Sequence, residues 1–233
     1  MKGEFFKGLQ HGVPIALGYL SVSFTFGMKA ISDGLTVFQA LAISMLNVTS
    51  AGQFAGLTLM AGSAPLIEMA LTQLVINLRY ALMSLSLGQK LDNSMTLPRR
   101  MIAAFCNTDE IFAVASSQPG LVGHLYFYGL MLTPYFGWAL GTLLGAAAGS
   151  LLPEAIRAAL GIAIYGMFLA IIIPPAKKQK PVRLVVLLAA AMSVLLKTVP
   201  LLNSISSGFG IIICAVVAAG IMAWLKPTEE VAS

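Results

Sequence analysis

Apolar residues fall into eight long blocks that are separated by short polar stretches. Most blocks are close to the roughly 20 residues with which a helix spans ~30 Å of hydrocarbon. The short alternating segments of a β-barrel are absent from the sequence. Because lipid offers a backbone no hydrogen-bond partners, the pattern predicts an all-α, polytopic membrane bundle of about six to eight transmembrane segments. The blocks are 11–31, 35–62, 64–88, 101–118, 122–151, 155–174, 182–200 and 208–225.

Composition supports a membrane protein and gives no sign of a soluble domain. Charged residues make up 10% of the chain, against roughly 25% in an ordinary soluble protein, and the mean hydropathy is +0.88. The connections are short, so we predict a single membrane domain over residues 1–233. Cys106 and Cys214 both lie in apolar blocks and suggest neither a disulfide nor a metal site. We expect no metal and no cofactor.

Two of the blocks are interrupted by polar residues. Block 35–62 contains the polar stretch 47–53, and block 101–118 carries 107–110 in its middle. We predict broken or re-entrant helices here, which membranes tolerate where the backbone lines a protein-buried or water-filled cavity. The alternative for the first block is one continuous helix in which Gly52 and Gly56 form a close packing contact. The alternative for the second is an interfacial segment whose acids lie in water.

The distribution of positive charge favours this interpretation. If all eight blocks cross once, seven Lys/Arg lie on the side of the N-terminus and six on the other, with no positive-inside bias. If blocks 35–62 and 101–118 make no net crossing, the division becomes ten against three. The first seven are Lys2, Lys7, Lys177, Lys178, Lys180, Arg183 and Lys226, and the other six are Lys29, Lys90, Arg99, Arg100, Arg157 and Lys197.

The second half of the chain leaves two topologies open. A crossing 101–118 with a re-entrant 155–174 gives an equally good charge bias. An internal similarity favours that version, because Gly8-Leu9 followed by Pro14 resembles Gly129-Leu130 followed by Pro134. Inverted repeats with broken helices are common in transporters, and an inverted repeat is one explanation of the similarity.

The interruption at 47–53 is the first candidate site. A helix that ends near Asn47 and another that begins near Thr49 or Ser50 would expose N–H groups and the positive end of a helix dipole, which suit a carboxylate. Gly52 would allow a close approach, and Gln53 would add a side-chain amide. We predict that a substrate carboxylate binds here, while its amino group meets carbonyls freed at Asn47 or a carboxylate elsewhere.

A polar stripe in block 64–88 is the second candidate. Its members recur at i, i+4, i+7 and i+11, which places them on one helical face: Gln73, Asn77, Tyr80 and Ser84. Such a stripe faces the bundle interior or a water path, and we include Gln73, Asn77 and Tyr80 among the substrate-binding residues. The alternative is hydrogen bonding between helices. Arg79 lies about 200° around the helix from Asn77, and we expect it to extend to the membrane interface.

Asp109 and Glu110 are the most unusual charges in the sequence. A carboxylate at the bilayer centre costs ~2.5–3.5 kcal/mol, so such residues are usually functional, paired or protonated. Burial favours the neutral form of a carboxylic acid, and we predict that Asp109 or Glu110 carries a proton. Asp109 is also a candidate partner for the substrate amino group. Glu68 lies near the end of a block, and we expect it to be solvated.

Other motifs point to packing. Gly141, Gly145 and Gly149 form a small-xxx-small run, which predicts close helix packing, with a partner subunit as one option. Enzyme signatures are missing, since there is no Walker A sequence and two histidines cannot supply a His-Glu-x-x-His zinc site. We therefore predict that the chain is not an enzyme. The net charge of +5 comes from short loops and does not indicate nucleic-acid binding.

Three internal motifs and an N-terminal pattern resemble those of the AzlC-type branched-chain amino acid exporters. The N-terminal pattern comprises Gly8, Pro14, Gly18, Phe26-Gly27, Ala30 and Gly34. The internal motifs are Ser50-Ala51-Gly52-Gln53-Phe54, Asn77-Leu78-Arg79-Tyr80 and Thr108-Asp109-Glu110-Ile111-Phe112. The similarity covers residues 5–175; length and hydropathy are the main support beyond it.

The resemblance implies a secondary transporter that exports leucine, isoleucine and valine, with methionine as a further candidate. It also implies a small, separately encoded AzlD-like membrane subunit, a lipid environment, and a location in the inner (cytoplasmic) membrane of a bacterium or archaeon. Together with the acids described above, it suggests proton coupling. The alternatives from the residues alone are a passive channel for a small solute and a non-transporting scaffold subunit.

Overall fold

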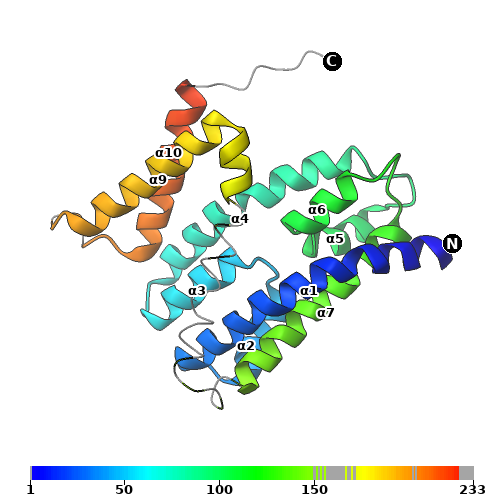
Figure 1. Ribbon diagram of the computed structural model, residues 1–233, viewed down its shortest axis with the longest axis horizontal. Helices are drawn as coiled ribbons and strands as arrows, with labels where there is room; N and C mark the ends of the chain where they lie inside the picture. Colours follow the sequence, from blue (N-terminus) through cyan, green and yellow to red (C-terminus); the bar gives the residue numbers. More distant parts are fainter. Residues whose placement is uncertain are drawn as a thin grey trace. The chain divides into compact units, whose positions relative to one another are not determined.

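The computed structural model describes residues 2–148, 172–200, 202 and 204–225, together with isolated positions between 149 and 171. In this part of the chain, helices are the regular structure, and the only β-type pairing is an isolated bridge between Leu91 and Val122 (Figure 1). The all-α fold predicted from the sequence is confirmed. The chain divides into two compact units, Met1–Leu57 with Asn77–Ile164 and Thr58–Ile76 with Tyr165–Ser233.

The helices follow the predicted blocks closely. Five described helices are long and apolar enough to cross a membrane. They are α1 (Lys2–Ser32), α4 (Leu66–Gly88), α7 (His124–Ala148), α9 (Lys180–Thr198) and α10 (Ser207–Leu225). The predicted block 155–174 lies largely outside the described residues.

Both interrupted blocks are broken helices. Block 35–62 consists of α2 (Val37–Leu46) and α3 (Ala51–Ala61), and block 101–118 is covered by α5 (Leu97–Phe105) and α6 (Asp109–Ser116). Thr36 caps the start of α2 with a capping box, in which its side chain accepts from the Gln39 backbone N–H and the Gln39 side chain accepts from the Thr36 backbone N–H. Thr108 caps the start of α6 through its hydroxyl. Because α2 ends with Asn47 as its C-cap and α3 begins at Ala51, the alternative of one continuous helix for block 35–62 is wrong.

Helices α1 and α7 pack against each other in parallel (Figure 1). A Cβ at Gly8 would overlap the backbone of α7 around Tyr126–Leu130, and a Cβ at Gly145 would overlap the backbone of Phe24. Contacts between these ends show that residue numbers rise together along both helices. The resemblance between their sequences therefore reflects two parallel glycine-lined helices, whereas an inverted repeat would run them in opposite directions.

The glycine run of α7 packs within the chain. A Cβ at Gly141 would meet Leu20 and Ser23 of α1, and the approach at Gly145 is equally close. Small residues let two membrane helices bring their backbones together, as the sequence predicted. The suggested partner subunit is wrong for these two glycines, because α1 already occupies their face. Gly149 lies outside the described residues.

The segment that contains α5 and α6 returns to its starting point. Asp92 N donates to Val122 O at 3.1 Å and Val122 N donates to Lys90 O at 2.8 Å, which joins the entry and the exit of the segment. Lys90 also extends its ammonium to the carbonyls of Ser116 and Gln118 at the end of α6. The two ends of this segment therefore lie on the same side of the membrane, and α5–α6 makes no net crossing.

The parallel α1–α7 pair and the joined ends of 90–122 show on which side of the membrane α4 ends. Since α1 and α7 are parallel, α7 begins on the side where α1 begins, and the joined ends of 90–122 place the end of α4 there too. Helix α4 has 23 residues, about 34 Å, enough to span. If α4 crosses, α2–α3 must return to the side from which it started. The arrangement agrees with the charge count that placed Lys90, Arg99 and Arg100 with the N-terminus.

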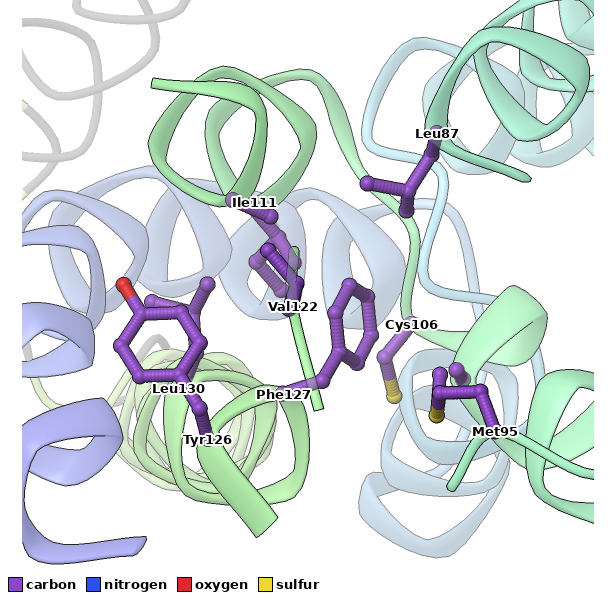
Figure 2. Packing of buried hydrophobic residues seen from close by; sticks show 10 residues of the cluster. Leu87, Met95, Cys106, Ile111, Val122, Tyr126, Phe127 and Leu130 are labelled. Carbon is purple, nitrogen blue, oxygen red and sulfur yellow. The ribbon is translucent and has the colours of Figure 1, made fainter. Parts of the chain in front are cut away.

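A buried core holds the broken α5–α6 pair against α7. Figure 2 shows Phe127 of α7 among the labelled side chains, with Cys106 and Met95 on one side and Val122 and Ile111 nearby. A second cluster joins Phe26 of α1 to Phe54 of α3, whose rings meet edge to face at a centroid distance of 5.4 Å. The two clusters anchor the two breaks to the α1–α7 pair.

In the second unit, a buried carboxylate joins α4 to α10. Glu68 is only 2% exposed, so the expectation that it is solvated is wrong. Its Oε1 accepts hydrogen bonds from Ser206 Oγ at 2.5 Å and from Gly208 N at 2.9 Å. The first turn of a helix leaves N–H groups without partners, and Glu68 satisfies one of them in α10.

Candidate functional site

The first break has the geometry that its sequence predicted. Helix α2 ends at Leu46 with Asn47 as its C-cap, and α3 begins at Ala51. Ser50 has φ +48°, a left-handed conformation that is costly for a residue other than glycine. At the start of α3, Gly52 N donates to Thr49 O at 3.4 Å and Phe54 N donates to Ser50 O at 3.1 Å. Tyr135 of α7 holds the preceding turn by donating to Met45 O at 3.1 Å.

Polar atoms at this break are buried without partners. Thr49 Oγ1, Ser50 Oγ and Gln53 Oε1 have no hydrogen-bond partner in the described part of the chain. Gln53 is 1% exposed, and its Nε2 donates to Ser44 Oγ at 3.0 Å, which in turn lies 2.7 Å from Thr142 Oγ1. One of the two hydrogens on Nε2 is therefore used within the protein, and Oε1 is an acceptor left for a ligand. Nε2 keeps a second hydrogen, so the predicted role of Gln53 as a donor to a carboxylate stays a prediction.

The second break is stabilised by α1. The Tyr19 hydroxyl lies 2.5 Å from Glu110 Oε2 and 2.5 Å from Thr108 Oγ1. A phenol has one proton and a carboxylate only accepts, so Tyr19 donates to Glu110 and Thr108 donates to Tyr19. The edge of the Tyr19 ring also packs on Trp138 of α7, 5.2 Å between centroids. Glu110 is therefore fixed by a tyrosine and is not an isolated charge.

Helix α4 contacts both breaks within one turn. Arg79 Nη1 lies 2.6 Å from Asp109 Oδ2 at the second break. Arg79 Nη2 donates to Tyr80 Oη at 3.2 Å, and Tyr80 Oη donates to Thr49 O at 3.4 Å at the first break. One turn further on, Asn107 Nδ2 donates to Ser84 Oγ at 3.1 Å. The two breaks, which lie about 60 residues apart in sequence, are thus connected through one face of α4.

The arrangement corrects two expectations about charge. Arg79 does not extend to the interface alone but pairs with Asp109, and the side chains are 42% and 37% exposed. Asp109 and Glu110 therefore both have partners, so the premise of an unpaired carboxylate is wrong. Their role in proton coupling stays a prediction. Partial exposure of the Arg79–Asp109 pair leaves both groups accessible to a ligand.

Only part of the predicted polar stripe of α4 lies at the two breaks. Tyr80 and Ser84 hydrogen-bond to the two breaks, which agrees both with an inward-facing stripe and with the alternative of hydrogen bonding between helices; the predicted substrate binding stays a prediction. Asn77 shares their face and their compact unit, whereas Gln73 belongs to the other unit. Sequence reasoning missed Tyr19, Ser44 and Thr142. Each lies in a largely apolar helix, and the hydroxyl group itself was the signal in the sequence that could have identified it.

Comparison with known proteins decides the family. The family model described as "AzlC protein" matches residues 14–152, more than half of the chain. The chain belongs to the AzlC family. The matched range contains both breaks, the Arg79–Tyr80 pair, α1 from Pro14 onward and all of α7, so the site lies within the family's own domain. The resemblance found in the sequence motifs is confirmed.

Relatives of this AzlC protein are membrane proteins. An uncharacterized membrane protein of Archaeoglobus fulgidus is 35% identical over 175 residues, which cover 74% of this chain and 76% of the relative. The inner membrane protein YgaZ of Escherichia coli is 27% identical over 237 residues, which cover 97% and 94%. An uncharacterized membrane protein of Helicobacter pylori is 30% identical over 154 residues, which cover 63% and 67%. No solved structure matches the chain.

Proposed function

We propose that this AzlC protein is a secondary transporter that exports branched-chain amino acids and exchanges them for protons. The substrates are leucine, isoleucine and valine, with methionine as a further candidate. The observation that carries the proposal is the meeting of two broken helices at Arg79 and Tyr80, in a unit that also holds buried polar atoms without partners. Irregular backbone at membrane depth is tolerated where it lines a site, and transporters bind substrates at such breaks.

The first break supplies groups for both ends of an amino acid. The positive end of the α3 helix dipole suits a carboxylate. The acceptor atoms nearby, Gln53 Oε1 and the carbonyl of Thr49, suit an ammonium group. Thr49, Ser50 and Gly52 form the turn between them, and Asn47 closes α2. Asn77 and Tyr80 lie on the adjoining face of α4.

Asp109 and Glu110 are the proposed coupling groups. Both start α6, where a helix dipole favours negative charge, and each has a partner that a proton would displace. Protonation of Asp109 would release Arg79, and protonation of Glu110 would reverse its hydrogen bond with Tyr19. Either change alters a contact that holds the second break. Residues of this kind connect a proton to a conformational change.

The membrane context follows from the family. We propose a location in the inner (cytoplasmic) membrane of a bacterium or archaeon, consistent with the Escherichia coli relative, which is named an inner membrane protein. We also propose that a small AzlD-like membrane subunit completes the transporter. The apolar outer faces of α9 and α10, with Leu187, Val194 and Val216 exposed, are available to lipid or to such a subunit.

Counterflow in proteoliposomes tests the proposal. Vesicles loaded with unlabelled leucine should take up labelled leucine transiently above its equilibrium level, with and without the co-expressed subunit as separate arms. A passive channel shows no overshoot, because it cannot couple one flux to another. A scaffold subunit shows no flux at all. Overshoot with an amino acid outside the branched-chain group would preserve the transporter and change its substrate.

A further inference from the structure

We propose that the Arg79–Asp109 ion pair is the receptor for the zwitterionic head group of the substrate and the point at which a proton competes with it. The inference rests on the proposed function and deepens it. In the free protein, the guanidinium and the carboxylate satisfy each other at 2.6 Å. An α-amino acid carries the same two charges in reverse, so its carboxylate replaces Asp109 on Arg79 while its ammonium replaces Arg79 on Asp109.

The position of the pair supports an exchange of this kind. Arg79 is linked through Tyr80 Oη to the carbonyl of Thr49, with distances of 3.2 and 3.4 Å. A carboxylate at the start of α3 is therefore within reach of the guanidinium. Both side chains are more than one-third exposed, so no deeply buried pair has to be opened. A planar guanidinium also binds a carboxylate with two parallel hydrogen bonds.

The chemistry of the exchange keeps the charge constant. A zwitterion has no net charge, and it inserts into a pair that has no net charge either. Each group of the protein exchanges one ionic partner for another, which avoids leaving an uncompensated charge within the membrane domain. A ligand with only one of the two charges leaves either Arg79 or Asp109 without a partner. The pair therefore selects α-amino acids over amines and carboxylic acids of the same shape.

Competition with a proton gives the direction of coupling. An ammonium pairs only with ionised Asp109, so a proton on that carboxylate excludes the amino acid. The proton and the amino acid therefore compete for Asp109: the amino acid binds only when the carboxylate carries no proton, and it is excluded when the carboxylate takes a proton up. The charged and titratable groups around Asp109 are Arg79 and Tyr80 from α4, Glu110 from α6 itself, and Tyr19 from α1 through Glu110. Proton entry from outside then releases the substrate there, as export requires.

Binding to the purified full-length chain tests the inference. Labelled leucine would be competed by three probes: leucine, 4-methylpentanoate, which lacks the ammonium, and 3-methylbutylamine, which lacks the carboxylate. The two single-charge probes should bind roughly ten- to a hundredfold more weakly than leucine. Asp109→Asn should weaken leucine by a similar factor but strengthen 4-methylpentanoate, which no longer has to displace a carboxylate from Arg79. Arg79→Gln should weaken leucine but strengthen 3-methylbutylamine, which no longer has to displace the guanidinium from Asp109.

Two controls separate recognition from folding. Asp33→Asn removes the carboxylate of a different ion pair, Lys29–Asp33 at 2.7 Å in the same unit, and should leave all three affinities unchanged. The reversed pair Arg79→Asp with Asp109→Arg keeps an ion pair but inverts its order. It should unfold at a temperature close to that of the natural protein yet lose leucine binding. Normal leucine binding by the reversed pair would show that the pair is structural and would overturn the inference.

Acidity adds an independent readout. Leucine affinity should fall as pH is lowered, up to tenfold per pH unit once Asp109 takes up protons, and the Asp109→Asn variant should lose this dependence. Equal loss of leucine and 4-methylpentanoate in Asp109→Asn, or unchanged affinity for both, would overturn the inference. If leucine does not bind but another α-amino acid does, the same tests with that ligand decide the inference, and only the branched-chain preference fails. If no α-amino acid binds, both proposals fail.

Discussion

Arg79 and Tyr80 are neighbours in sequence, yet they contact different breaks of the membrane domain. Arg79 Nη1 reaches Asp109 at the start of α6, and Tyr80 Oη reaches the carbonyl of Thr49 just before α3. The two side chains also contact each other, with the guanidinium 5.0 Å from the centre of the Tyr80 ring. A movement of either half-helix therefore changes the environment of the other. The second motif of the family lies at the point where this coupling occurs.

The distribution of positive charge predicts the side of the membrane on which two loops lie. We expect a single cysteine at Asn93 and another at Gln179 to resist labelling by an impermeant thiol reagent in intact cells, because positive charge marks both loops as cytoplasmic. Asn93 is exposed, whereas neighbouring Ser94 is hydrogen-bonded to Asp92. Cys106 and Cys214 are first replaced. Labelling of either single cysteine from outside would contradict the topology, and labelling after permeabilisation is the positive control.

Close packing of α1 on α7 predicts a large cost for one methyl group. Gly145→Ala places a Cβ against the backbone of Phe24, which cannot move without shifting the helix. Overpacking of this kind costs ~1–3 kcal/mol of unfolding free energy. Gly18→Ala is the matched control, since a Cβ there meets no atom within 4 Å. Thermal unfolding in detergent should separate the two variants by several degrees. Equal stability would mean that the parallel helices are further apart.

Much of the fold was predictable because membrane helices are long and apolar. The breaks were also predictable: Asn47 to Gln53 and Asn107 to Glu110 put polar groups where lipid gives no partner, and only irregular backbone or a site explains them. The partners of these groups could not be predicted. Arg79 has a long flexible arm, so its helical face did not determine that it reaches Asp109, and Tyr19 is a single residue in an apolar helix. Glu68 was expected to be solvated because it lies close to one end of block 64–88, but the start of α10 covers it.

The hydroxyl of Tyr19 is expected to stabilise the second break. Tyr19→Phe removes the donor to Glu110 and the acceptor for Thr108 while keeping the ring on Trp138. A hydrogen bond to a charged group contributes ~1.5–3 kcal/mol, so the unfolding free energy should fall by about that amount. In a double-mutant cycle with Glu110→Ala, the second change should cost much less in the Tyr19→Phe background. Additive losses would show that the two groups do not interact.

In the second unit, Glu68 is expected to hold the first turn of α10. Glu68→Ala leaves Gly208 N–H and the Ser206 hydroxyl without their acceptor, which costs about 1–3 kcal/mol for buried groups. Gly208→Ala should be damaging as well, because its Cβ would lie 2.5 Å from Glu68 Oε1 and 2.6 Å from Thr72 Oγ1. Gly220→Ala in the same helix meets no atom within 4 Å and is the control. Hydrogen exchange at the start of α10 should rise in the first two variants and not in the third.

The side-chain amide of Gln53 distinguishes two ways of binding an amino acid at the first break. The sequence suggested that this amide donates to the substrate carboxylate, and Gln53→Ala would then weaken leucine more than leucinamide. In the structure, Nε2 already donates to Ser44, and Oε1 is the atom without a partner among the described residues. We therefore expect Gln53 to accept from the substrate ammonium.

On this account, Gln53→Ala should weaken leucine binding about ten- to a hundredfold, the range for a hydrogen bond to a charged group. It should weaken 4-methylpentanoate, which has no ammonium, much less. Ser44→Ala is the companion variant: it removes the group that orients the Gln53 amide but touches no proposed ligand atom, so a smaller loss with the same selectivity is expected. Competition against labelled leucine measures all of these. If leucine and 4-methylpentanoate lose equally, the change is a packing defect in a buried position, which a shifted unfolding temperature would confirm. If neither affinity changes, the first break is not the site, and the Asn77–Tyr80 face of α4 is the next place to look.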